Sequence, residues 1–124
     1  MTFLSDFYEW LSDSEITGGR IYPTVLPAGV TLPATVYNVI SAPMETPTHD
    51  DDTDTAGRVR IQVDSWATTL SGAVSAGSTV RLRAQQFTTD ECHFTRLDNF
   101  NIIFDTDTGW YRFINEFILS VKLT

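Results

Sequence analysis

The stretch GRVRIQVDSWA, residues 57–67, decides the fold class because apolar and polar side chains alternate along it. Val59, Ile61 and Val63 occupy every second position, with arginine, glutamine and aspartate between and after them. Successive side chains of a β-strand point to opposite faces, so the pattern predicts a strand with one apolar face and one charged outer face.

The residues that follow predict a helix over about residues 68–84. Thr68 is a suitable N-cap, and Arg81 and Arg83 lie near the C-terminal end, where positive charge is favourable. Its apolar face would consist of Leu70, Val74, Gly77, Val80 and Ala84. Glycine costs about 1 kcal/mol relative to alanine in a helix interior, so this helix needs tertiary packing. Its small side chains suit a close approach to a sheet.

The C-terminal part predicts a β-hairpin. Residues 100–105 and 110–121 read as strands, and Gly109 at the end of DTDTG can take the positive φ of a tight turn. The last strand is long and alternates regularly. Before the hairpin the alternation is weak, and we expect an irregular strand over about residues 91–96.

The N-terminal part predicts a helix and two extended segments. Apolar and aromatic residues recur at intervals of three and four over about residues 2–13, which indicates an amphipathic helix. Residues 20–22 read as a short extended piece and residues 32–42 as a strand, joined by a loop over 23–31. Pro33 fits only the start or edge of a strand, because proline cannot donate to the ladder.

Residues 43–56 contain two prolines, four aspartates and almost no apolar side chain. Such a segment cannot bury enough surface to offset the entropy of ordering, so we expect a long mobile acidic loop. Together the elements predict an α+β fold in a single domain over residues 1–124. A mostly antiparallel β-sheet is flanked by two α-helices, at about 2–13 and 68–84.

Composition restricts the function. Sixteen acidic against eight basic residues give a net charge of −8, which opposes DNA phosphates. No apolar run approaches the roughly 20 residues that span a bilayer, and the first ten residues carry acids where a signal peptide carries bases. Cys92 has no second cysteine to pair with, as expected of a protein made in a reducing cytoplasm.

No residue pattern indicates catalysis or a cofactor. Zinc needs about four ligands, and the chain offers only His49, Cys92 and His93 as nitrogen or sulfur donors. A calcium loop starting at Asp50 would have Ile61 at the place of its bidentate glutamate. Adjacent Cys92 and His93 on a strand point to opposite faces and form no nucleophile–base pair. We expect no catalytic residue, no metal site, no cofactor and no enzymatic activity.

The order of the elements resembles the tail-terminator family of tailed bacteriophages, also called tail-completion or tail-to-head joining proteins and including minor tail proteins of the U type. The resemblance covers nearly the whole chain. It is carried by RIYP at 20–23, LP at 32–33 before a strand that includes Tyr37, VDSWA at 63–67, and TGWYR at 108–112. The glycine-rich second helix and the unusually acidic loop depart from the family.

The resemblance implies a structural virion protein at the head–tail junction, made in the host cytoplasm. Six copies would close into a ring that terminates the tail tube. Its partners would be further copies of itself, the tail-tube protein and a head-completion or connector protein. DNA would pass through the ring as a duplex without being bound, which suits the negative charge, and no membrane is involved.

A ring needs interfaces between its copies, and we expect six aromatic and basic residues to contribute to them. These residues are Arg20, Tyr22, Tyr37, Arg58, Arg60 and Trp66. Trp66 fits the core equally well, and the two strand arginines could instead discourage edge aggregation. Three other functions stay open: a head-completion protein, a tail-tube subunit, and a small hydrolase or metal-dependent enzyme, which would need a convergent polar pocket.

Overall fold

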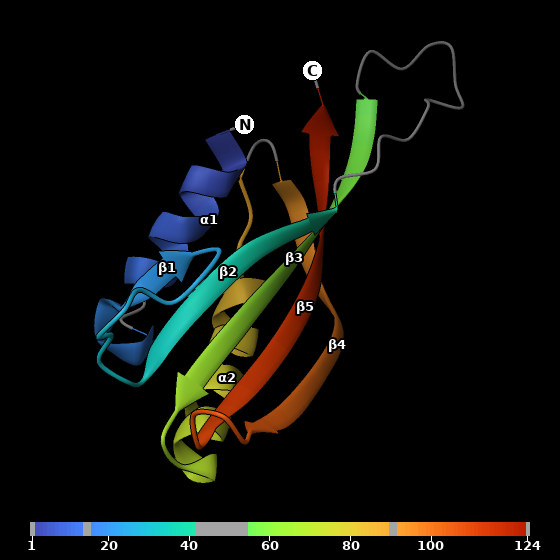
Figure 1. Ribbon diagram of the computed structural model, residues 1–124. Coiled ribbons are helices and arrows are strands. Elements are labelled where there is room, and N and C mark those ends of the chain that lie inside the picture. The colour runs from blue at the N-terminus through green and yellow to red at the C-terminus, as the bar shows by residue number, and fades with distance from the viewer. Residues whose placement is uncertain (1, 14–15, 42–54, 90–91, 124) are drawn as a thin grey trace.

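The computed structural model describes residues 2–13, 16–41, 55–89 and 92–123. Along the chain the elements are helix α1 (Thr2–Asp13), a 3-10 turn η1 (Ile16–Gly19), β1 (Ile21–Pro23), β2 (Ala34–Ser41), β3 (Thr55–Ala67), α2 (Leu70–Gln85), β4 (Cys92–Asp105) and β5 (Trp110–Leu123) (Figure 1).

The described strands form one five-stranded sheet in the order β1-β2-β3-β5-β4. β1 runs parallel to β2, and every other neighbouring pair is antiparallel. The two longest pairings, β3 with β5 and β5 with β4, form an extended twisted ribbon. The predicted mostly antiparallel sheet is therefore confirmed, and its two edges are β1 and β4.

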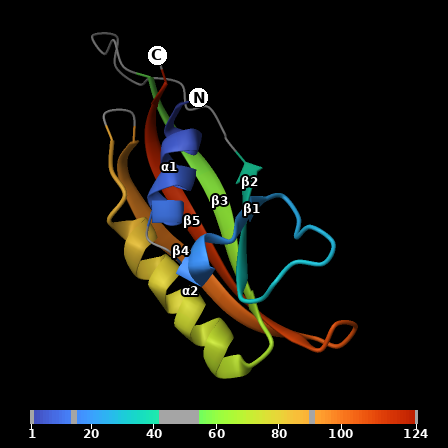
Figure 2. The same ribbon diagram turned by 90° about the vertical axis from the view of Figure 1, so that its left-hand side faces the viewer.

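Both helices pack on the same face of the sheet (Figure 2). The larger core cluster combines Phe7 and Leu11 of α1, Val80 and Ala84 of α2, and alternate residues of the sheet. The sheet residues are Ile21, Val59, Ile61, Val63, Cys92, Phe117 and Leu119. This arrangement confirms the α+β class with two flanking helices. No helix among the described residues covers the other face of the sheet, which is called the face without helices below.

The predicted close approach of α2 to the sheet is confirmed at Gly77. A Cβ atom added there would overlap the ring of Phe113 on β5. Beside this contact, the buried Asn115 donates from Nδ2 to the Gly77 carbonyl over 3.0 Å. Glycine is therefore required at this position by backbone-to-ring packing, despite its unfavourable helix propensity.

Helix α2 differs from the prediction at its start and in its apolar face. Its N-cap is Thr69 rather than Thr68, since the Thr69 hydroxyl accepts from the Gly72 amide over 3.0 Å. Leu70 and Val74 are exposed. The side chains that face the sheet are Ala73, Gly77, Val80 and Ala84. The buried stripe is thus narrower and made of smaller residues than predicted.

The strand boundaries also differ. β4 is one strand over Cys92–Asp105 rather than two segments, and its register shifts twice, between Cys92 and Phe94 and between Leu97 and Asn99. Each bulge displaces the alternation by one residue, which explains the weak pattern.

β3 begins at Thr55, before the predicted start at residue 57. The predicted acidic loop falls largely on residues 42–54, outside the described ranges. Gly109 has the expected positive φ, 76°.

Candidate interaction surface

The C-terminal half of β4 exposes a run of large apolar side chains. Within FNIIF, residues 100–104, the side chains of Phe100, Ile102, Ile103 and Phe104 are between 38% and 49% exposed. β4 lies at an edge of the sheet, with a described strand on one side only. An edge strand offers unpaired backbone groups to another chain, and a contiguous exposed apolar patch marks an interaction site.

Pairing with β5 fixes the direction of these side chains. Phe100, Ile102 and Phe104 stand opposite Asn115, Phe113 and Tyr111, so they lie on the helix side of the sheet. The Phe100 ring stacks on Phe113 with centroids 5.7 Å apart, and Phe104 contacts Tyr111 at 4.9 Å. Ile103 points to the other face, opposite Arg112. The apolar run therefore wraps around the edge.

One flank of α2 continues this surface. The Arg81 guanidinium lies over the Phe100 ring, 5.4 Å from its centroid, so this flank of the helix faces β4. Leu70 and Val74 precede Arg81 by eleven and seven residues, whole numbers of turns that place them on the same flank. Both are exposed. The β4 edge surface is defined here as Leu70, Val74, Phe100, Ile102, Ile103 and Phe104.

The face of the sheet without helices carries a network of bonded polar side chains beside aromatic ones. Arg112 on β5 donates from Nη2 and Nε to Asp64 Oδ2 over 2.6 and 2.9 Å, and Gln62 donates to the same carboxylate. Asp64 is buried, and burial raises the pKa of its carboxyl while the Arg112 contacts oppose the rise. The Arg112 guanidinium also lies 5.2 Å from the Trp66 ring, which meets Trp110 edge-on.

A second charged group lies further along the same face. Arg60 Nη1 binds Asp98 at 2.6 Å and lies 3.5 Å from Glu116. The hydrogen bond with Asp98 raises the pKa of the Arg60 guanidinium. Each of these side chains is between a quarter and about a third exposed, so these ion pairs contribute little to the free energy of folding.

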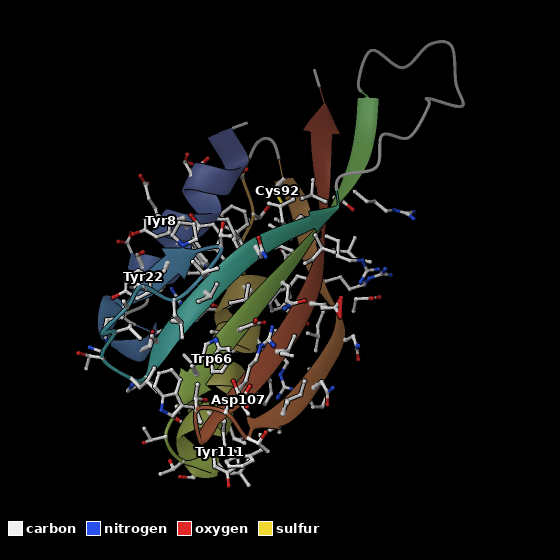
Figure 3. All side chains as sticks on the ribbon, in the orientation of Figure 1. Tyr8, Tyr22, Trp66, Cys92, Asp107 and Tyr111 are labelled. Carbon is white, nitrogen blue, oxygen red and sulfur yellow. The ribbon has the colours of Figure 1, made fainter. Side chains whose placement is uncertain are left out.

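The structure separates the interface candidates predicted from sequence. Arg58, Arg60 and Trp66 project from β3 on the face without helices. Tyr22 stands opposite Val36, which itself stands opposite Asp64, so Tyr22 shares that face (Figure 3). Tyr22 of β1 therefore lies on the opposite face of the sheet from Tyr37 of β2.

The other two candidates lie elsewhere. Tyr37 is on the helix side, where its ring meets Tyr8 at 5.6 Å and burial raises the pKa of its hydroxyl. Arg20 precedes β1 and donates from Nε to the Pro33 carbonyl over 2.9 Å. The six candidates therefore do not form one surface, and their role in an interface stays a prediction.

The β4 edge surface was not among the candidates. Its signal in the sequence is the run Asn101 to Phe104, where three consecutive apolar residues interrupt the alternation of a strand next to a turn. A strand buried on both faces gives the same signal. The sequence does not reveal that β4 lies at an edge, because strand order depends on contacts between distant parts of the chain.

The described part of the chain shows no assembled chemical centre. Within its ranges no three His, Cys, Asp or Glu side chains come together as metal ligands. Cys92 is buried in the core. A hollow of about 250 Å³ beside the loop after β1 includes Asp64 and Arg112, which already bind each other. None of the described helices is long and apolar enough to cross a lipid bilayer.

Comparison with known proteins identifies a relative of the fold. No protein-family model and no curated protein sequence matches the chain. A solved structure described as the virion of a native gene transfer agent (GTA) particle contains a chain of similar fold, with a TM-score of 0.62 and 13% sequence identity. The match covers 94% of this chain and 92% of that chain. The chain therefore has the fold of a component found in a virion structure.

Proposed function

We propose that the chain is a structural virion protein that associates with copies of itself, and that its ring terminates a phage tail tube and joins the tail to the head connector. The fold similarity supports a virion role, since it extends over almost the whole of both chains. The order of sequence elements that resembles tail terminators supports the finer assignment.

The observation that carries the proposal is the β4 edge surface. Fully burying one exposed large apolar side chain contributes about 1.5–3 kcal/mol. These six are already more than half buried, so covering them in an assembly would contribute the remaining part of that free energy. On a lone molecule an apolar edge strand promotes aggregation, whereas in a closed ring each copy covers the edge of its neighbour. A self-assembling subunit therefore accounts for this surface.

The charge of the chain is consistent with a ring around DNA. A net charge of −8 repels phosphates, so a passing duplex would not be retarded by binding. The partners we propose are the tail-tube protein on one side of the ring and a head-completion or connector protein on the other. The proposed contacts between copies and with these partners act through shape complementarity and the burial of apolar surface. The proposal includes no catalytic step.

Electron microscopy of the purified protein at increasing concentration tests this function. We expect discrete closed rings, and rings at one end of each tube when tail tubes are added. Long open tubes formed by the protein alone would instead identify a tail-tube subunit. Rings that bind a head connector but no tail tube would identify a head-completion protein.

A further inference from the structure

We propose that neighbouring copies meet head to tail, with the β4 edge surface of one copy covering the turn after β1 of the next and Val25 as the central contact. The inference rests on the proposed function, because it assumes self-association. It adds which two surfaces meet and predicts that they differ from each other.

Val25 is a large apolar side chain that is 67% exposed. The turn that carries it is fixed by backbone bonds. The Thr24 amide donates to the Tyr37 carbonyl over 3.0 Å, and the Val25 amide donates to the Pro23 carbonyl over 2.8 Å. A side chain presented on an ordered turn loses little entropy on binding, as expected of an interface contact. We define the β1 edge surface as Arg20, Tyr22, Val25 and Leu26.

β1 and β4 are the first and last strands of the sheet. The turn after β1 leans over the face without helices, where Val25 and Leu26 line the same hollow as Trp66 and Arg112. The two surfaces also differ in composition. One presents the single strongly exposed apolar side chain of Val25 on a turn, and the other presents six partly exposed apolar side chains on β4 and α2. Contact between unlike surfaces is heterologous, and a heterologous contact repeats around a closed ring. A contact between two β4 edges would end at a dimer and leave Val25 in water.

Strand register places complementary charges at the same end of both edges. Ile21 on β1 stands opposite Thr35 on β2. The same row of paired residues continues through β3 and β5 and reaches Ile102 on β4, so Ile21 and Ile102 lie at the same level of the sheet. Arg20 precedes Ile21 toward the end where β4 turns into β5. That turn carries Asp105 and Asp107 (Figure 3).

These charges suit a contact between copies. Within the described ranges neither Arg20 nor Asp107 takes part in an ion pair. When the β4 edge of one copy lies beside β1 of the next, the acidic turn comes near Arg20. Such rim charges select the orientation of an apolar contact more than they strengthen it.

Two single variants and their mixture test the inference. Val25→Glu disrupts the β1 edge surface, and Phe104→Glu disrupts the β4 edge surface. Each variant alone should have the mass of one subunit by light scattering. An equimolar mixture should form a one-to-one dimer and nothing larger, because it contains one intact pair of surfaces. Leu82→Glu, at a 59% exposed position on the outer side of α2, is the control and should assemble like the wild type.

The outcomes separate this inference from the proposed function. If the wild-type protein associates neither alone nor on added tail tubes, the proposed function fails. If the wild type forms rings and both variants also form them, the head-to-tail contact is wrong while self-association stands. If only Phe104→Glu prevents assembly, Val25 takes no part in the contact and the inference is wrong. A mixture that stays monomeric, although circular dichroism shows both variants folded, also overturns the inference.

Discussion

Gly77 is the residue on which the position of α2 depends most directly. In an exposed helix Gly→Ala would stabilise by about 1 kcal/mol. Here the added methyl overlaps the Phe113 ring, so Gly77→Ala should lower the free energy of unfolding by about 2 kcal/mol, as overpacked cores do. Urea denaturation measures the change. Ser75→Ala, on the exposed side of the same helix, is the control and should stay within about 0.5 kcal/mol of wild type.

Asp64 makes stability depend on pH. Burial raises the pKa of the Asp64 carboxyl above 3.8. The folded protein therefore binds a proton at this carboxyl more tightly than the unfolded chain does. The contribution of Asp64 to the free energy of unfolding should therefore fall as the pH rises from about 3.8 to the folded pKa, and stay constant above it.

Asp64→Asn removes this titration. The stability of wild type minus that of the variant should decrease with rising pH across the same window, in urea denaturation at several pH values. A difference that increases with pH would mean that the Arg112 ion pair outweighs burial. The alternation of the strand predicted Asp64 on the charged outer face, and the structure agrees. It could not predict burial, because Val36 and Arg112, which flank Asp64, come from neighbouring strands.

Among the elements, α2 has an N-cap that differs between the sequence-based prediction and the structure. Thr69 accepts the Gly72 amide, so Thr69→Ala should lower the free energy of unfolding by about 1 kcal/mol. Thr68, the N-cap predicted from sequence, is exposed and precedes the cap. Thr68→Ala should change stability by less than about 0.5 kcal/mol in the same urea experiment. The reverse order of the two effects would contradict the observed cap.

Local patterns predicted most elements because turns and periodicity are local properties. The alternation in β3 and β5 and the positive φ of Gly109 required no knowledge of the rest of the chain. β4 was divided in two because its bulges break the alternation. The apolar face of α2 was misplaced because Leu70 and Val74 are apolar but exposed, and sequence alone does not separate a core side chain from an interface side chain.

At the scale of the whole molecule, strand order decides which surfaces are free. The sequence predicted a sheet with two helices, but not that FNIIF would lie on an edge strand. Nor did it predict that both helices would cover one face. The interface candidates were chosen one at a time from residue type. In the structure these candidates lie on both faces of the sheet, and the exposed apolar surface lies on the edge strand β4 instead.

The charges at the two edges give a further prediction. Arg20→Glu should weaken self-association several-fold, because it brings like charge to the acidic turn of the neighbouring copy. Asp107→Arg should do the same, and the double variant should recover most of the loss. Sedimentation velocity at low and high salt measures both effects, which salt should reduce. Absence of recovery in the double variant would show that these side chains do not meet.

The mass of the purified protein across concentration tests the central claim, closed self-association, most directly. Light scattering should show the 13.9 kDa subunit at high dilution and a plateau at a fixed whole multiple of it, six copies by the proposed function, at higher concentration. A mass that keeps rising would contradict a closed ring. A single-subunit mass at every concentration, with no assembly on added tail tubes, would contradict self-association itself.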